Sequence, residues 1–144
     1  MRRDIHFEVF YPHAPERVWR AITDPAQLSS WLMATDFEAV VGRRFTMRAK
    51  PAPGFDGLVS GEVLEADPPR RLVYSWSGGP LKDTLVVWTL EARGKGTWLR
   101  LEHRGFSGLA GLGVSALLGM GWGRLLRRTL PEHLTGPRPL EQKG

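Results

Sequence analysis

The chain has 144 residues and a mass of 16.1 kDa, the size of one ordinary domain that can bury a core. It contains no cysteine, which excludes a disulfide scaffold, a thiolate zinc site, an iron–sulfur cluster and a cysteine nucleophile. The formal net charge is +5, but the charged residues are scattered, which favours a soluble surface with a basic bias over a nucleic-acid or lipid footprint.

The N-terminal part of the chain predicts a strand followed by two short helices. Apolar and polar residues alternate over residues 5–11, which is typical of a strand. Because this pattern starts almost at once, we expect no secretory signal and a cytoplasmic location. Pro15 suits the first turn of a helix, and Asp24 is a good N-cap for a second helix, with Gln27 completing a capping box.

The middle of the chain has a hydrophobic period of two, which predicts a series of strands. Short turn signals rich in glycine and proline separate them, so consecutive strands are expected to pair antiparallel. Together with the first strand they make seven, the others covering residues 36–41, 44–50, 57–66, 71–77, 83–91 and 97–106.

Residues 105–123 carry no charge, yet we do not expect a membrane span. Seven of these nineteen residues are glycine, which weakens both the apolar gain and the helix propensity. We expect an apolar loop that leads into a helix near Ser115, with Pro131 kinking or ending that helix and a disordered tail over residues 137–144. The loop could be a ligand gate, a homodimer contact, a membrane-touching patch or a plain connector. The helix would turn these residues inward: Leu118, Trp122, Leu125, Leu126 and Leu130.

A single long helix cannot stand alone and must cover one face of the sheet. The predicted inward strand positions are mostly large: Phe45, Met47, Val63, Leu72, Tyr74, Trp76, Val86, Trp88, Leu90, Leu99 and Leu101. A strongly curved sheet around one helix can leave an apolar gap between the two layers, where small ligands bind. The predicted fold class is therefore α+β.

The order of these elements resembles the START-like (SRPBCC, helix-grip) superfamily, and more narrowly the bacterial branch named after the activator of the 90-kDa heat-shock chaperone ATPase. Three motifs carry the resemblance, in residues 14–25, 61–76 and 96–106, followed by Gly121-Trp122. It implies one domain over residues 1–136, with a seven-stranded antiparallel sheet curved around a long C-terminal helix and two short helices after the first strand. It also implies a hydrophobic small molecule or lipid as ligand, or a chaperone as partner in a stress response.

Catalytic and metal-binding motifs are absent from the sequence. HExxH, GxSxG and the phosphate-binding GxxxxGK[ST] loop do not occur, and no two of the four histidines have metal-ligand spacing. We expect no metal, no cofactor and no catalytic residue. His103 alternates inward with Leu99 and Leu101, so it either orients a ligand or acts as a base in a cavity, or is simply hydrogen-bonded to a neighbour.

The six tryptophans offer two interpretations, a packed core or the wall of a ligand cavity. Trp98 alternates outward, and the basic helix face around Arg124, Arg127 and Arg128 lacks the exposed aromatic platform that nucleic-acid binding needs. The candidate ligand-binding residues are Phe45, Met47, Tyr74, Trp76, Trp88, Leu101, His103 and Trp122.

The leading functional hypothesis is a small-molecule binding or transport protein. Its ligand would be apolar or amphipathic, of lipid or aromatic polyketide type, held between the sheet and the C-terminal helix. The resemblance keeps two alternatives open: a protein-interaction module like the chaperone-ATPase activator, and a cyclase or hydrolase of the same fold. A homodimer also remains possible.

Overall fold

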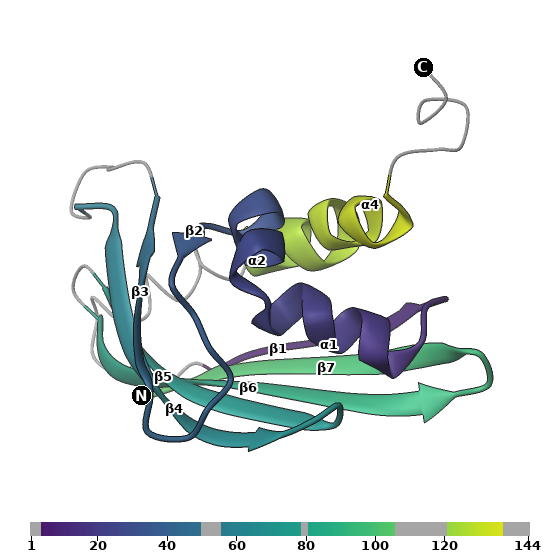
Figure 1. The fold of residues 1–144 in the computed structure, drawn as a ribbon, viewed down its shortest axis with the longest axis horizontal. Helices are drawn as coiled ribbons and strands as arrows, with labels where there is room; N and C mark the ends of the chain where they lie inside the picture. Colours follow the sequence, from purple (N-terminus) through teal and green to yellow (C-terminus); the bar gives the residue numbers. More distant parts are fainter. Residues whose placement is uncertain (1–3, 50–55, 79–80, 106–120, 137–144) are drawn as a thin grey trace.

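The computed structural model describes residues 4–49, 56–78, 81–105 and 121–136, and shows the helices on one face of a curved sheet (Figure 1). In chain order the elements are β1 (Ile5–Tyr11), α1 (Pro15–Thr23), α2 (Pro25–Trp31), β2 (Ala34–Thr35), β3 (Arg44–Arg48), β4 (Leu58–Asp67), β5 (Arg71–Gly78), β6 (Leu81–Arg93), β7 (Gly96–Arg104), the π-helical turn η1 (Leu125–Thr129) and α4 (Leu130–Thr135).

The sheet has seven strands in the order β1-β7-β6-β5-β4-β3-β2, and each pair of neighbours is antiparallel. The predicted seven-stranded antiparallel sheet is therefore confirmed. From β2 to β7, neighbours in the sheet are also consecutive in the chain, which agrees with the short turns in the sequence. Only β1 departs from this order, because it pairs with the last strand.

The inner face of the sheet forms the core with the helices. Every inward strand position expected from the alternation is buried, from Phe45 on β3 to Leu101 on β7. Trp122, Leu126, Leu130 and Leu134 come from the helical segment and belong to the same buried cluster. The apolar face of the strands, which repeats every second residue, thus packs against the apolar face of the helix on one side of the sheet. A two-layer fold requires this arrangement.

The strand expected over residues 36–41 is wrong. Only Ala34–Thr35 pairs with β3 there, and the chain then continues without regular structure. Side chains take the place of the backbone ladder, because the carboxylate of Asp36 accepts the amide of Thr46 at 2.8 Å and the hydroxyl of Thr35 donates to the Thr46 carbonyl at 2.7 Å. Phe37 is fully buried as a result.

The first two helices begin where the sequence predicts. Asp24 caps α2, its carboxylate accepting the amide of Gln27 at 3.0 Å. The expected reciprocal half of a capping box is missing, since the Gln27 side-chain oxygen instead accepts from the Arg17 guanidinium at 2.8 Å. Arg17 also donates to the carbonyls of His133 and Leu134, so it joins α1 to the end of α4.

The C-terminal helical segment already runs through residues 121–124 and continues past Pro131, so of the two expected effects, a kink or a stop, the stop does not occur. The chain widens into the π-helical turn η1 just before the proline, and the Leu130 amide bonds to the Leu125 carbonyl. This five-residue spacing accommodates a proline, which has no amide to donate. The expected helix start near Ser115 and the expected disordered tail lie outside the described residues.

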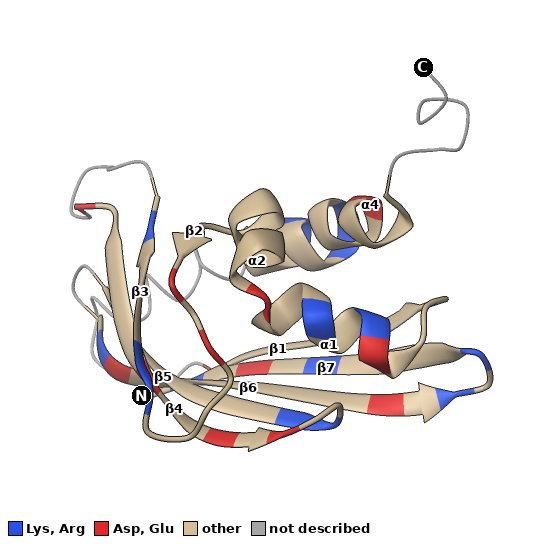
Figure 2. Cartoon of the chain, viewed as in Figure 1, with Lys and Arg blue, Asp and Glu red and all other residues tan. Residues whose placement is uncertain are grey.

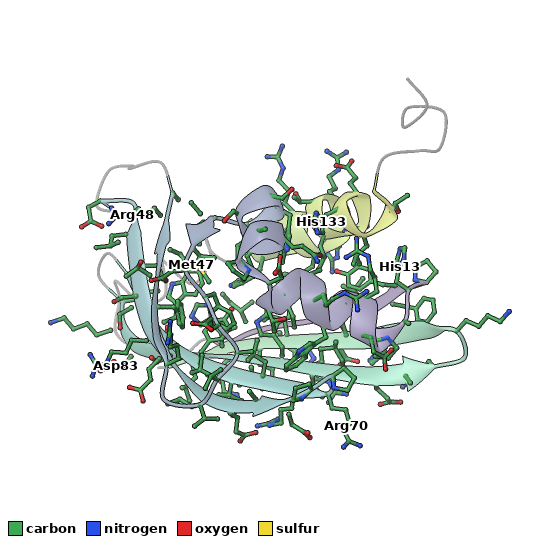
Figure 3. All side chains as sticks on the ribbon, viewed as in Figure 1. His13, Met47, Arg48, Arg70, Asp83 and His133 are labelled. Carbon is green, nitrogen blue, oxygen red and sulfur yellow. The ribbon has the colours of Figure 1, made fainter. Side chains whose placement is uncertain are left out.

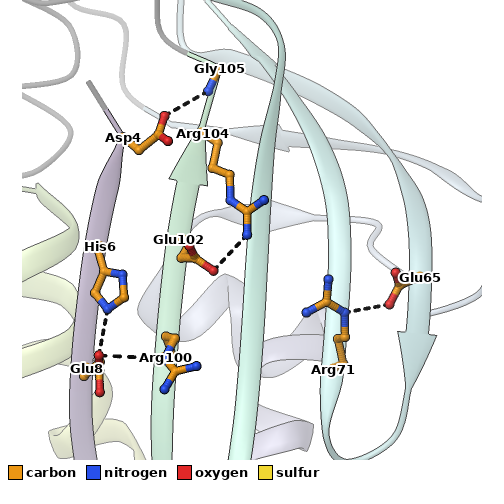
Figure 4. Close-up of polar contacts among 9 residues, drawn as sticks. All are labelled: Asp4, His6, Glu8, Glu65, Arg71, Arg100, Glu102, Arg104 and Gly105. Carbon is orange, nitrogen blue, oxygen red and sulfur yellow. Dashed lines mark hydrogen bonds and ion pairs between the residues drawn. The ribbon is translucent and has the colours of Figure 1, made fainter. Parts of the chain in front are cut away.

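The outer face of the sheet is polar. Figure 4 shows ion pairs across or along the strands, among them Arg71 with Glu65 at 2.7 Å and Arg104 with Glu102 at 2.9 Å. Trp98 lies on this face, as expected, and donates to Glu8 at 2.9 Å. Acidic and basic residues occur on helices and strands alike (Figure 2). No helix in the described part of the chain has the length and apolar character needed to cross a membrane.

Candidate ligand-binding site

All eight candidate residues lie in the buried layer between the sheet and the helices. The least buried of them, Trp76, is 5% exposed. Met47 on β3 is fully buried, with Thr35 and Val59 as its cross-strand neighbours, and its position beside β3 is marked in Figure 3. Leu101 on β7 lies directly opposite Trp88 on β6. The remaining six form two groups of rings.

The first group joins the sheet to the C-terminal helix. Trp122 comes from the helical segment, and its ring centroid lies 5.6 Å from that of Trp88 and 5.9 Å from that of Trp76. The imidazole of His103 meets Trp76 edge-on at 5.5 Å. Tilted and edge-to-face contacts of this kind are the geometry that aromatic rings prefer. We call Trp76, Trp88, His103 and Trp122 the indole cluster.

A hydrogen-bond chain fixes the histidine in this cluster. The Trp122 indole N–H donates to His103 Nδ1 at 3.1 Å, and His103 Nε2 lies 2.8 Å from the hydroxyl of Thr84. Because Nδ1 accepts, the neutral ring carries its proton on Nε2 and donates it to Thr84. The Thr84 hydroxyl in turn donates a hydrogen bond to the carbonyl of Trp76 at 2.7 Å.

Burial keeps His103 neutral. Loss of hydration disfavours the imidazolium and lowers the pKa of His103 from 6.5 to about 3. Both ring nitrogens are engaged, so the residue matches the simpler of the two expectations, a histidine hydrogen-bonded to its neighbours. To act as a base, it would have to give up its bond from Trp122.

The second group surrounds the tyrosine of β5. Phe45 lies 5.2 Å from Tyr74 between ring centroids, and Phe37 lies 5.0 Å from Phe45 and 5.4 Å from Tyr74. The Tyr74 hydroxyl accepts from the Trp88 indole at 3.0 Å, which links the two groups. Burial raises the pKa of Tyr74, so its phenol stays protonated.

Two members of the site were missed in the sequence. Thr84 alternates with Val86 and Trp88 on β6, and this alternation places it on the inner face, where a threonine needs a partner. Phe37 lies in a segment that alternates like a strand in sequence but is irregular in the structure, where its amide bonds to the Thr35 hydroxyl and its ring is fully buried.

The arrangement is suited to holding apolar surface. The Trp88 indole N–H is bonded to Tyr74, the Trp122 indole N–H to His103, and His103 also to Thr84. What these groups leave for contact is mainly the faces of rigid rings. No group of three histidine or carboxylate side chains able to hold a metal ion occurs in the described ranges.

Comparison with known proteins shows the family. The family model described as activator of Hsp90 ATPase homolog 1-like protein matches residues 12–135, so the chain belongs to this family. No curated protein matches the chain.

Solved structures share the fold over nearly the whole chain. The protein MLL2253 from Mesorhizobium loti is 30% identical with a TM-score of 0.84, and the match covers 94% of this chain and 99% of that one. DynU16, a protein from the dynemicin biosynthetic locus, is 25% identical with a TM-score of 0.76; the match covers 96% of this chain and 49% of DynU16. The Aha1 dimer from Colwellia psychrerythraea has a TM-score of 0.72 at 19% identity, over 86% of this chain and 90% of that one, which shows the fold alone.

Proposed function

We propose that this family member binds a hydrophobic or amphipathic small molecule, of lipid or aromatic polyketide type, between the sheet and the C-terminal helix. The observation that carries the proposal is the indole cluster. Three tryptophans and a neutral histidine meet where the helix touches the sheet, and the polar side-chain atoms of Trp88, His103 and Trp122 are already hydrogen-bonded. A ligand at this position meets ring faces and few hydrogen-bonding groups.

Trp122 is the residue we expect to respond to the ligand. It is the only member of the indole cluster that comes from the helix, and one hydrogen bond to His103 holds its indole N–H. A ligand that enters beside the helix would replace ring–ring contacts of Trp122 with its own apolar surface. Covering about 200 Å² of apolar surface is worth roughly 5 kcal/mol before the costs of association.

The comparison with DynU16 supports a small-molecule role. That protein is 25% identical to this chain and belongs to a biosynthetic locus. The likeness supports the class of ligand and leaves its identity open. The family description points instead to activation of the Hsp90 ATPase, which keeps a chaperone interaction as the competing function.

Native mass spectrometry of freshly purified protein tests the proposal first. We expect a mass excess over 16.1 kDa that disappears on denaturation, together with an extractable lipid or aromatic compound. The same sample is used in a pull-down with the 90-kDa chaperone. A bare mass together with an enriched chaperone would replace the proposal with the interaction role.

A titration with cis-parinaric acid, a fluorescent fatty acid, locates the site. Trp122→Leu should weaken the affinity of the protein for this fatty acid by about tenfold, the effect expected when a central aromatic contact is lost. Trp98→Leu is the matched control, because it removes a tryptophan from the outer face. Circular dichroism first establishes that both variants are folded. Equal affinities for the two variants and the unmodified protein would contradict the assignment.

A further inference from the structure

A pocket lies on the outer face of the sheet, away from the indole cluster. It has a volume of about 450 Å³ and crosses β3, β4 and β5 next to the start of β6. Along β5, Ser75 and Ser77 line it and alternate with the buried Tyr74 and Trp76, so the serines face outward. Asp83, at the start of β6, is labelled in Figure 3.

Hydroxyl groups form the floor of this pocket. The Ser75 hydroxyl oxygen accepts the amide of Glu62 at 2.9 Å, and that of Ser77 accepts the amide of Asp83 at 2.8 Å. A hydroxyl that accepts a hydrogen bond still has its own proton to donate. The hydroxyls of Ser60 and Thr46 continue the floor across β4 and β3. The floor therefore offers several donors to a ligand with oxygen acceptors.

Charged groups surround this floor, and the ion pairs among the described residues involve none of them. Arg44 and Glu62 lie directly opposite each other on β3 and β4, yet within the described ranges no ion pair joins either of them to another residue. The carboxylate of Asp83 is also unpaired there, and its backbone has a φ of 52°, held by the bond from its amide to Ser77. Asp36 contributes a third carboxylate.

The charge of the pocket is opposite to that of the protein. Three carboxylates against one guanidinium leave a formal −2, whereas the whole chain carries +5. A cation is therefore repelled by the protein as a whole and attracted at this place. In the part of the chain that the structure describes, no three acidic or histidine groups are placed to hold one metal ion. The ligand must reach several of them at once.

We infer that this pocket binds a hydroxylated organic cation of the amino-sugar type. Its ammonium groups would pair with Glu62 and Asp83, while its hydroxyl and ring oxygens would accept from the serine floor and from Arg44. A simple polyamine would leave Arg44 and the hydroxyl donors without acceptors, and a neutral sugar would leave the carboxylates without cations. The inference is independent of the ligand proposed for the inner site.

A pair of disaccharides that differ in the acetylation, and therefore in the charge, of their amino groups tests this inference. The glucosamine disaccharide has two amino groups, and its N,N′-diacetyl form is neutral. Titration below neutral pH, followed by amide chemical shifts, should show binding of the amino form with shifts at Ser75, Ser77 and their neighbours. Equal binding of both forms, binding of the acetylated form alone, or no binding at millimolar concentration would overturn the inference.

Charge-neutral variants identify the residues that bind. Glu62→Gln and Asp83→Asn should each weaken binding by about tenfold, as expected for the loss of a charge-assisted bond. Asparagine tolerates the backbone of position 83, so that variant should fold. The matched control is Glu65→Gln on the same strand, outside the pocket and paired with Arg71. If Glu65→Gln weakens binding equally, the effect comes from the general loss of negative charge, and the proposed site is refuted.

Discussion

The buried histidine makes the stability of this protein sensitive to weak acid. In the folded state the pKa of His103 is lowered from 6.5 to about 3, because burial penalises the imidazolium. Between these values the unfolded chain binds a proton that the folded chain does not. Stability is therefore fully present above pH 6.5, falls as the pH drops below this value, and levels off near pH 3.

The size of the effect follows from the same two values. The whole interval from 6.5 to about 3 corresponds to at most about 5 kcal/mol. Down to about pH 4.5, before carboxylates protonate, the loss is roughly 2 kcal/mol, with a slope approaching about 1.4 kcal/mol per pH unit. A domain of this size has about 5–15 kcal/mol in total, so the loss is readily measured.

Urea unfolding at a series of pH values is the assay, and His103→Gln is the variant. Glutamine can accept from Trp122 and donate to Thr84 as the histidine does, but it does not titrate. We expect the variant to keep its stability between pH 6.5 and about 4.5 while the unmodified protein loses about 2 kcal/mol. His133→Gln is the comparison variant. The pKa of His133 is lowered in the same direction, by burial and by Arg17, but the side chain is only partly buried, so this variant should keep most of the pH dependence. If His103→Gln loses as much stability as the unmodified protein, the reasoning is refuted.

Three further predictions concern the frame around the site. Arg17→Ala should lower the free energy of unfolding by about 2 kcal/mol, since this guanidinium bonds to the carbonyls that end α4, whereas Arg20→Ala, in an exposed control position, should change it little. Gly61→Ala should prevent stable folding, because the new carbon would lie 2.0 Å from a neighbouring carbonyl oxygen. Gly42→Ala, at a φ of 89° with open space around it, should lower the free energy of unfolding by only about 1 kcal/mol. Melting temperatures distinguish the two variants. Asp24→Ala should cost about 1 kcal/mol through loss of the α2 cap, and calorimetry that finds no change would contradict the capping argument.

Much of this fold could be predicted because local patterns and tertiary packing agree. The alternation along β5, β6 and β7 places large side chains on one face, and those are the residues that the helices bury. The family was also recognised from the motifs in the sequence, and the match to residues 12–135 shows it. All eight predicted ligand-binding residues are buried in one layer, although their role in binding remains a prediction.

The failures occur where side chains replace backbone contacts. Residues 36–41 alternate like a strand, but the carboxylate of Asp36 accepts the Thr46 amide at the edge of β3. This side-chain bond replaces a backbone pair and ends the strand pairing. The Gln27 side chain accepts a hydrogen bond from Arg17 of helix α1 and does not complete the capping box. The lining of the outer pocket comes from polar side chains on three neighbouring strands. Which of these side chains lie next to each other is set by the register in which β3, β4 and β5 pair. No single segment of the sequence carries that information.

The pairing of β1 with β7 sets the order in which this protein can fold. Ile5 lies opposite His103, so the first strand docks only after nearly the whole chain has been made and its other strands can form a partner edge. Contacts between residues so distant in sequence slow folding, because a long loop must close first. Tyr11, at the end of β1, also bonds to the carbonyl of Leu126 in the helix. Docking of the first strand and closure of the helical layer should therefore occur as one late event, observable as a single slow phase in the fluorescence of the inner tryptophans.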